Sequence, residues 1–144
     1  RSTQGVSSAA SDVYKRQYLL SAPEGNALNV LPVPALDREV VRVLGKTRRY
    51  MEDHLADPLT IPALSRMAML SATTFKDAFR RLYGLPVHAW LRQRRMERAA
   101  ELLRDSSLSV LGVAQSVGYG SASQFTAAFR RQYGMTPAKY RKDV

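Results

Sequence analysis

A fourteen-residue stretch occurs twice in this chain, 50 positions apart, and it constrains the fold more than any other feature. Residues 71–84 read Ser-Ala-Thr-Thr-Phe-Lys-Asp-Ala-Phe-Arg-Arg-Leu-Tyr-Gly, and residues 121–134 read Ser-Ala-Ser-Gln-Phe-Thr-Ala-Ala-Phe-Arg-Arg-Gln-Tyr-Gly. Nine of the fourteen positions are identical. Each copy opens with a serine suited to a helix N-cap and closes with a glycine suited to a C-terminal cap. The repeat therefore predicts two capped helices of equal length.

The two copies agree on one helical face and differ on the other. Three- and four-residue spacing defines the inward faces, which comprise Phe75, Ala78, Phe79 and Leu82 in the first copy and Phe125, Ala128, Phe129 and Tyr133 in the second. The outward positions carry Thr74, Lys76 and Asp77 in one copy and Gln124, Thr126 and Ala127 in the other. A repeated scaffold with different exposed side chains is typical of two elements that recognise different targets, and it points away from catalysis.

The charge of the chain indicates a polyanionic partner. The sequence holds 22 Lys and Arg against 12 Asp and Glu, which gives a net charge of +10 and a pI near 10.4. The whole excess lies in residues 40–144, with 18 of the basic and 8 of the acidic residues. Such a distribution favours nucleic-acid binding. A nonspecific nucleic-acid packaging protein would share this charge, and that alternative stays open.

Periodicity and breakers predict an all-α fold. Residues 1–36 have the composition of a tail and linker, and residues 1–17 resemble a translated sequencing adapter more than native protein. A helix follows Asp37 and stops at Pro58. Two helix-turn-helix motifs are then expected at about 60–83 and 110–133, joined by a long helix over about 87–104, and a last helical turn begins at Thr136-Pro137. Residues 37–144 thus form the expected folded part, of about seven helices.

The motifs of this folded part belong to a recognisable pattern. The second half carries Ser109-Val110, Val113-Ala114, Gly118-Tyr119, Ser123-Gln124-Phe125, Phe129-Arg130-Arg131 and the run from Gly134 to Arg141; the first half carries Leu59-Thr60, Leu64, Ser71, Phe75, Phe79-Arg80 and Gly84; the joining helix carries Arg95-Met96, Ala99 and Leu102-Leu103. With these residues, the stretch 47–144 resembles the DNA-binding domain of AraC/XylS-type bacterial transcription regulators. The sequence Gly84-Leu85-Pro86-Val87 is similar to that of the siderophore-responsive subgroup of this family.

The resemblance implies two subdomains tied by the long helix, each of which inserts a recognition helix into successive major-groove segments. It also implies RNA polymerase as a partner, a cytoplasmic, nucleoid-associated location, and an effector ligand that acts only through a further domain. The residues before Val40 are too few for such a domain, so we expect a fragment or a stand-alone two-motif member. Two departures stand out: Ser65 occupies a packing position that is usually small and apolar, and Gly112 lies inside a helix, where it costs about 1 kcal/mol relative to Ala.

Eight outward positions are candidates for reading bases. The candidates are Thr73, Thr74, Lys76 and Asp77 in the first repeat and Ala122, Ser123, Gln124 and Ala127 in the second. Lys76 can donate to guanine, Gln124 can pair with adenine, and Asp77 can accept from cytosine. Lys76 and Asp77 could also be solvated helix residues, and Asp77 could pair with Arg80 or Arg81 one turn away. We expect the first repeat to carry more base specificity than the second.

Seven further residues are candidates for phosphate binding. They are Ser71 and Ser121 at the helix starts, and Arg80, Arg81, Arg95, Arg130 and Arg131. The arginines of the repeats occupy the same place in both copies, as a contact independent of base sequence would. Arg94 and Arg98 are interpreted instead as members of a salt-bridged solvent face with Glu97 and Glu101.

Other function classes lack their residues. With no cysteine in the sequence, zinc fingers and thiol catalysis are excluded. No nucleophile–base pair, metal-ligand cluster, phosphate-binding glycine loop or cofactor motif is visible, so we expect no enzyme activity, no metal and no cofactor. No apolar run approaches the ~20 residues that cross a membrane. Trp90 is expected in the core, and His54 and His88 are expected at caps or on the surface.

Overall fold

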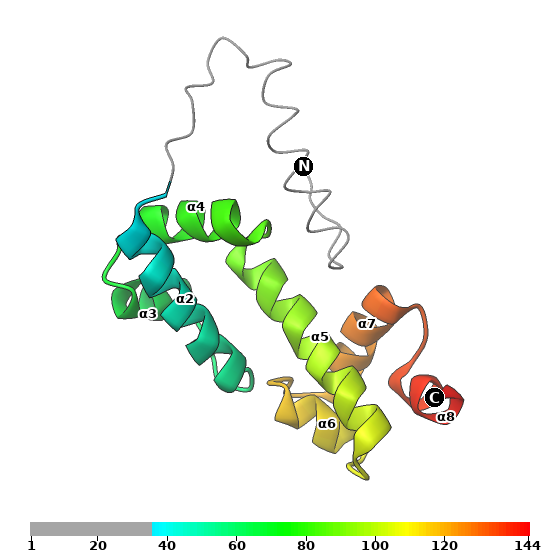
Figure 1. Cartoon of the computed structure of the whole chain (residues 1–144). Coiled ribbons are helices and arrows are strands. Elements are labelled where there is room, and N and C mark those ends of the chain that lie inside the picture. The colour runs from blue at the N-terminus through cyan, green and yellow to red at the C-terminus, as the bar shows by residue number, and fades with distance from the viewer. Residues whose placement is uncertain (1–35) are drawn as a thin grey trace, which may run out of the picture. The chain divides into compact units, whose positions relative to one another are not determined.

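A computed structural model describes residues 36–144, which form seven helices and no strand (Figure 1). The helices are α2 (Arg38–Asp53), α3 (Ile61–Met67), α4 (Ala72–Tyr83), α5 (Val87–Asp105), α6 (Val110–Ser116), α7 (Ala122–Tyr133) and α8 (Pro137–Asp143). The all-α prediction is confirmed. Most helices lie within about two residues of their expected bounds, but α2 ends at Asp53, well before Pro58, where it was expected to stop. The tail and adapter predictions for residues 1–35 fall outside the described residues.

Hydroxyl caps fix where most of these helices begin. In α3, α4, α6, α7 and α8 the capping side chain accepts a hydrogen bond from a backbone N–H three residues on; the caps are Thr60, Ser71, Ser109, Ser121 and Thr136. Such a bond satisfies one of the donors that the first turn of a helix leaves free. At the other end, Gly84 and Gly134 cap α4 and α7 with φ of 85° and 78°, in the left-handed region that glycine adopts without strain. The capping residues predicted from the repeat are all confirmed.

The described chain divides into two compact units. The first comprises residues 36–49 and Thr60–Trp90, and the second comprises Tyr50–Leu59 and Leu91–Val144. The end of α2 and the segment after it therefore belong with the C-terminal half of the chain. Nothing in the local sequence of residues 50–59 predicts this assignment to the second unit.

The first unit is organised around aromatic contacts of α4. Phe79 is fully buried, and its ring lies 5.9 Å from that of Phe75, 4.7 Å from that of Tyr83 and 5.8 Å from that of Trp90, centroid to centroid. Trp90 itself is half-buried, so it packs on Phe79 at the edge of the core and not inside it as expected. Ser65, the polar residue at a packing position, is buried and its hydroxyl donates to the carbonyl of Pro62 at 3.3 Å. That bond removes most of the cost of burying a hydroxyl.

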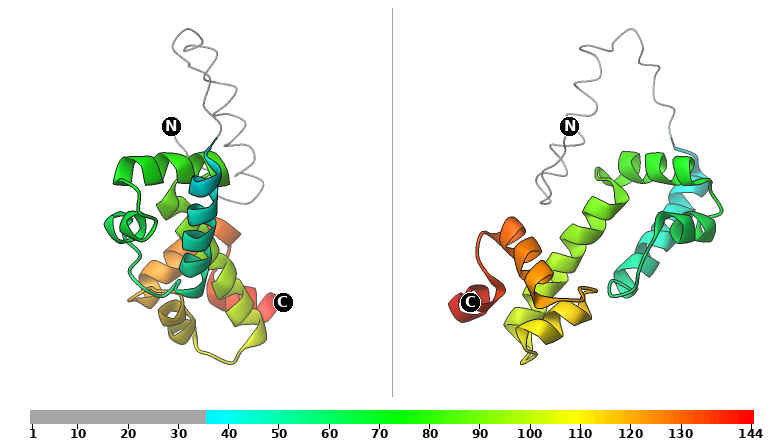
Figure 2. Two further views of the ribbon diagram at one scale, coloured as in Figure 1. Left: turned by 60° about the vertical axis from the view of Figure 1, so that its left-hand side comes forward. Right: turned by 180° about the vertical axis from the view of Figure 1, so that it is seen from behind.

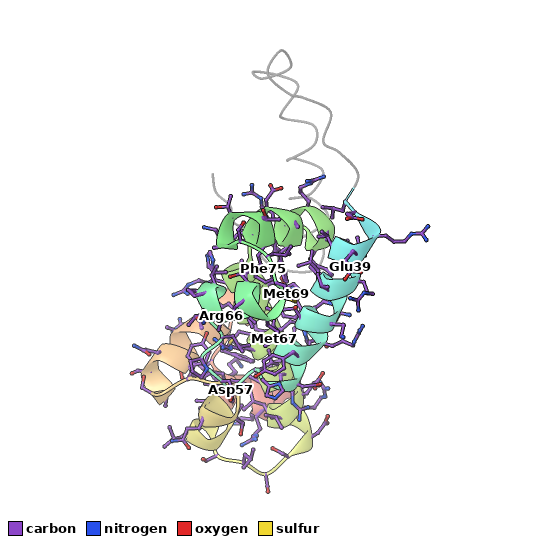
Figure 3. The ribbon with its side chains drawn as sticks, turned by 90° about the vertical axis from the view of Figure 1, so that its left-hand side faces the viewer. Glu39, Asp57, Arg66, Met67, Met69 and Phe75 are labelled. Atoms are coloured by element: carbon purple, nitrogen blue, oxygen red, sulfur yellow. The ribbon has the colours of Figure 1, made fainter. Side chains whose placement is uncertain are left out.

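The turn between α3 and α4 faces solvent. Met69 has a φ of 59°, unusual for a residue other than glycine, and its side chain is 89% exposed. Met67, at the end of α3, is 46% exposed. Figure 3 shows both methionines at this turn, with Phe75 on the neighbouring α4.

The second unit repeats the aromatic arrangement. Phe129 lies 5.8 Å from Phe125, 4.6 Å from Tyr133 and 5.3 Å from Tyr140, and these rings join a core that α5, α6 and α7 supply. Both views of Figure 2 show α6 and α8 on either side of α7. Tyr140 stands 50 residues after Trp90 and packs on Phe129 as Trp90 packs on Phe79. The duplication therefore extends beyond the fourteen residues in which the sequence displays it.

Two glycines of the second unit sit in tight surroundings. Gly118, with a φ of 90°, passes so close to the end of α2 that a Cβ would lie 3.0 Å from the carbonyl oxygen of Leu55. At Gly112, the unexpected glycine in α6, a Cβ would lie 3.2 Å from the capping Oγ of Ser109. Gly118 thus serves both a left-handed turn and a close approach of two backbone segments.

Candidate nucleic-acid interface

The start of α4 is organised by its cap. Ser71 Oγ accepts from the Thr74 N–H at 3.1 Å, and the Ser71 hydroxyl donates to Thr74 Oγ1 at 3.0 Å. The side chain of Thr74 is therefore already engaged at the helix start. Thr73 and Lys76, one on either side of it, are exposed and point away from the buried Phe75. Of the candidate base readers in α4, Thr73 and Lys76 have the geometry of an open reading face.

Asp77 forms an ion pair inside α4. Its Oδ2 lies 3.4 Å from Arg81 Nη1, one helical turn further on. The Arg81 side chain is only 17% exposed, and Arg80 is half-buried beside it. The possibility that Asp77 holds an arginine in place is thus realised in the structure, with Arg81 as the partner. The pair also offsets the negative charge that Asp77 brings to the outward face of α4.

The start of α7 has the same cap and a more open face. Ser121 Oγ accepts from the Gln124 N–H at 3.1 Å. Ser123, Gln124 and Ala127 are exposed, and Ala122 is half-buried. At the end of the helix both predicted phosphate residues, Arg130 and Arg131, are exposed. The structure thus places the second set of candidates together on the solvent side of one helix.

Arg95, a candidate for phosphate binding, makes two hydrogen bonds within the second unit. Its Nε donates to the carbonyl of Leu55 at 2.8 Å, and its Nη2 donates to the carbonyl of Asp57 at 3.0 Å. Burial lowers the pKa of this guanidinium below its ordinary value, against a smaller opposite effect of Tyr119. The contacts close the end of α2, because they satisfy carbonyls that no helical N–H reaches. This geometry gives Arg95 a structural task within the second unit, and its phosphate contact stays a prediction.

Known proteins match this chain over the same region. Residues 64–143 match the family described as "Helix-turn-helix domain". The chain is 32% identical over 121 residues to the HTH-type transcriptional regulator ExsA of Pseudomonas aeruginosa, an alignment that covers 84% of this chain and 42% of that protein. It is 34% identical over 121 residues to the RCS-specific HTH-type transcriptional activator RclR of Escherichia coli, with 84% and 40% covered. The chain thus spans about two-fifths of the length of these relatives.

A solved structure supplies the decisive comparison. The DNA-binding domain of AdpA, a global transcriptional factor, was crystallised in complex with a target DNA; it is 34% identical, aligns with a TM-score of 0.67, and the match covers 69% of this chain and 90% of that one. The C-terminal domain of AraT, a response regulator from Geobacillus stearothermophilus, aligns with a TM-score of 0.67 at 28% identity, covering 77% and 89%. The chain belongs to the AraC/XylS family of transcription regulators. Residues 36–144 hold its double helix-turn-helix, DNA-binding part, a non-enzymatic domain.

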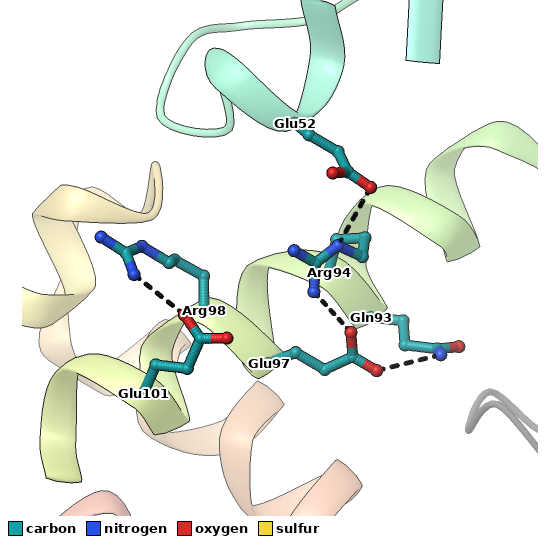
Figure 4. Close-up of polar contacts among 6 residues, drawn as sticks. All are labelled: Glu52, Gln93, Arg94, Glu97, Arg98 and Glu101. Carbon is teal, nitrogen blue, oxygen red and sulfur yellow. Dashed lines mark hydrogen bonds and ion pairs between the residues drawn. The ribbon is translucent and has the colours of Figure 1, made fainter. Parts of the chain in front are cut away.

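The charged face of α5 is occupied by ion pairs in this AraC/XylS-type domain, as predicted. Arg94 lies 2.6 Å from Glu97 and 3.6 Å from Glu52, and Arg98 lies 2.9 Å from Glu101 (Figure 4). These arginines carry much of the positive charge of the joining helix. Carboxylates therefore already neutralise Arg94 and Arg98, whereas Arg130 and Arg131 of α7 are exposed and, within the described residues, in no such pair.

Two further polar residues, His54 and Arg141, contact backbone carbonyls. His54 Nδ1 lies 2.8 Å from the carbonyl of Tyr50, and the two rings stack 3.9 Å apart, so this histidine caps the end of α2 as expected. Arg141 binds the carbonyls of Leu103 and Ser106 at 2.8 and 3.2 Å, a second carbonyl clamp that the sequence analysis missed. Local sequence carries no signal for such a clamp, since its two ends lie 35 residues or more apart.

The described part of the chain lacks the residue patterns of a metal site and of a membrane-spanning helix. Residues 36–144 contain no cluster of three or more potential metal ligands. No helix among them is both long and apolar enough to cross a bilayer.

Proposed function

We propose that α4 and α7 are two recognition helices that read successive major-groove segments of a bipartite promoter site. The observation that carries the proposal is the contrast within the repeat. The two Phe residues and the Ala between them are identical and buried in both helices, while the outward positions beside them differ in chemistry. A protein that binds DNA nonspecifically has no need of this contrast. That AdpA, a relative by sequence and fold, binds a target DNA supports the proposal.

The proposed base readers are those whose side chains are exposed and uncommitted to a cap. Lys76 donates to guanine O6 or N7, Thr73 contacts a thymine methyl, and Gln124 pairs with adenine N6 and N7. Ser123 and Ala127 are exposed beside Gln124 and allow close approach to the base edges. The side chains of Thr74, Asp77 and Ala122 are secondary candidates, because the first two are engaged within α4 and the third is half-buried.

Phosphate contacts are proposed for the helix starts and the paired arginines. The caps at Ser71 and Ser121 present first-turn N–H groups, and a helix N-terminus attracts anions. Arg130 and Arg131 are exposed and can reach the DNA backbone, whereas the side chains of Arg80 and Arg81 are half-buried. We therefore assign the larger sequence-independent contribution to the second motif and the larger base-specific contribution to the first.

The wider role of the protein follows from the family. We propose that it acts in the bacterial cytoplasm on nucleoid DNA, that it contacts RNA polymerase at the promoter, and that an effector acts through a domain other than the one described. A siderophore-type effector stays a prediction.

The experiment that tests this function is selection from a random double-stranded DNA library with the full chain at near-physiological salt. We expect enrichment of a non-palindromic site with two halves about one helical turn (~10 bp) apart. The Lys76→Ala variant, selected in parallel, should lose preference within one half only, at a cost of roughly 1–3 kcal/mol. Salt-sensitive binding without any enriched sequence would overturn the proposal in favour of a packaging role.

A further inference from the structure

A hollow of about 610 Å³ lies along the outward face of α4. Thr73, Lys76, Asp77 and Arg80 of α4 line it, and so do Pro86, just before α5, and His88, in the first turn of α5. All these residues belong to the first unit. The proposed base readers therefore do not stand on an isolated helix, because a second element borders them.

His88 is the polar side chain that α5 contributes to this hollow. It is exposed, and within residues 36–144 no hydrogen bond, ion pair or ring contact engages its imidazole. The packing of its own unit does not use it, since Trp90, two residues on, makes the contact with Phe79. In the register of the repeat the matching residue of the second motif is Ala138, which has no donor. The histidine thus distinguishes the surroundings of α4 from those of α7.

We propose that His88 is a DNA contact of the first motif, on the sugar–phosphate strand that borders the half-site read by α4. This inference rests on the proposed function. DNA that lies against Thr73 and Lys76 must also cover the hollow, because these residues form its wall. A phosphate in that place meets Arg80 on one side and His88 on the other. An imidazole keeps at least one N–H donor in every protonation state, so it can bind a phosphate oxygen at any pH of interest.

The charges around the hollow are compatible with a phosphate. Lys76 and Arg80 face it with positive charge, and Asp77 is the one carboxylate among the lining residues. Asp77 already lies 3.4 Å from Arg81, which reduces its repulsion of an anion. A contact on one motif only would anchor the first half-site and set the register in which α4 meets the base edges, as phosphate contacts generally do.

The test compares four variants of the full chain: His88→Ala, His88→Gln, His88→Glu and, as a control with the same added charge on α2 outside the hollow, Val41→Glu. Affinity is measured by fluorescence anisotropy on the selected site and on a scrambled duplex of equal length. We expect His88→Ala to weaken binding to both duplexes by about three- to tenfold, which is the range for one ordinary hydrogen bond. His88→Gln, which keeps a donor, should stay closer to the wild type, and His88→Glu should be weaker than Val41→Glu.

A second arm locates the contact on the DNA. Single methylphosphonate substitutions remove the charge of one phosphate at a time along both half-sites. At one phosphate beside the first half-site, the wild type and His88→Ala should bind equally. Equal binding of both proteins to the unmodified site would overturn the assignment of His88 while the selected bipartite site still stood. A failure of the proposed function would look different, because the wild type itself would then select no site.

Discussion

The two helix-turn-helix motifs use the same Phe-Arg-Arg sequence in different surroundings. In α4 the Arg81 side chain is 17% exposed and pairs with Asp77 four residues earlier; in α7 the position four residues before Arg131 is Ala127, and Arg131 is exposed. One outward substitution thus changes what a shared residue is free to do. The lesson is that identity within a repeat shows which residues were duplicated, whereas availability for DNA depends on the residues that differ.

The turns of the two motifs also share a backbone conformation but differ in their surroundings. Both contain a residue with positive φ, Met69 at 59° and Gly118 at 90°. Met69 is 89% exposed, so its side chain meets no obstacle and only the backbone conformation is costly. Gly118 approaches the carbonyl of Leu55 too closely to leave comfortable room for a Cβ. Similar backbone geometry therefore demands glycine in one motif and tolerates methionine in the other.

The largest effects should come from the aromatic cores. Phe79→Ala and Phe129→Ala should each destabilise their own unit by about 3–5 kcal/mol, since each removes a fully buried ring that contacts three others. Urea unfolding can separate the two units, because Trp90 is the single tryptophan of the chain and lies in the first. The urea concentration at half-unfolding, followed by tryptophan fluorescence, should fall more in Phe79→Ala than in Phe129→Ala. The same midpoint followed by circular dichroism should fall in both variants. Equal fluorescence shifts would mean that the units unfold together.

The next prediction concerns the turn of the second motif. Gly118→Ala should destabilise the second unit by at least the roughly 1–3 kcal/mol of a strained left-handed residue, because the new Cβ also meets the Leu55 carbonyl. Gly120→Ala is the matched control: a Cβ there meets nothing within 4 Å, so the change should stay within about 0.5 kcal/mol. Thermal unfolding of both variants gives the comparison. A Gly118→Ala protein as stable as the control would show that α2 and this turn can move apart freely.

Local features of the fold were predictable from sequence, and long-range ones were not. The caps at Ser71 and Ser121 could be predicted because each side chain bonds to the backbone three residues away. The clamp of Arg95 on Leu55 could not, since the two residues are 40 positions apart and nothing near Arg95 distinguishes it from its neighbours on α5. The membership of residues 50–59 in the second unit escaped prediction for the same reason.

For the candidate site, too, local features could be predicted from sequence and long-range ones could not. That Lys76 and Gln124 would be exposed followed from helical spacing alone. The half-burial of Arg81 depends on how α4 packs within its unit, and the presence of His88 beside α4 depends on where the chain runs after Leu85-Pro86. Periodicity describes one helix at a time, so it gives the reading face without the residues that border it.

A reciprocal exchange would test the contrast between the two arginine pairs. Asp77→Ala makes the first helix resemble the second, and it should strengthen binding to all DNA sequences about two- to fivefold, because a carboxylate leaves the proposed interface. Ala127→Asp should weaken binding by a similar factor, as the new carboxylate can pair with Arg131. Both changes should alter the dependence of affinity on salt more than the preferred sequence. A lost preference at one base pair in Asp77→Ala would instead identify Asp77 as a reader of cytosine.

The smallest effect on DNA binding should come from Arg94 and Arg98, the ion-paired arginines of α5, which we expect to lie outside the DNA contact. Arg98 and Glu101 are both about half exposed, and a pair of this kind contributes only about 0.3–0.5 kcal/mol. Arg98→Ala should therefore change thermal stability slightly and leave the number of released counterions unchanged. Arg94→Ala should cost more stability, since Arg94 bridges Glu97 and Glu52 in a less exposed place. Arg131 is exposed, so Arg131→Ala should instead lower the slope of log affinity against log salt concentration by about one, with little loss of stability. If Arg98→Ala lowered the slope as well, α5 would belong to the interface, and net charge would predict DNA contacts better than ion pairing does.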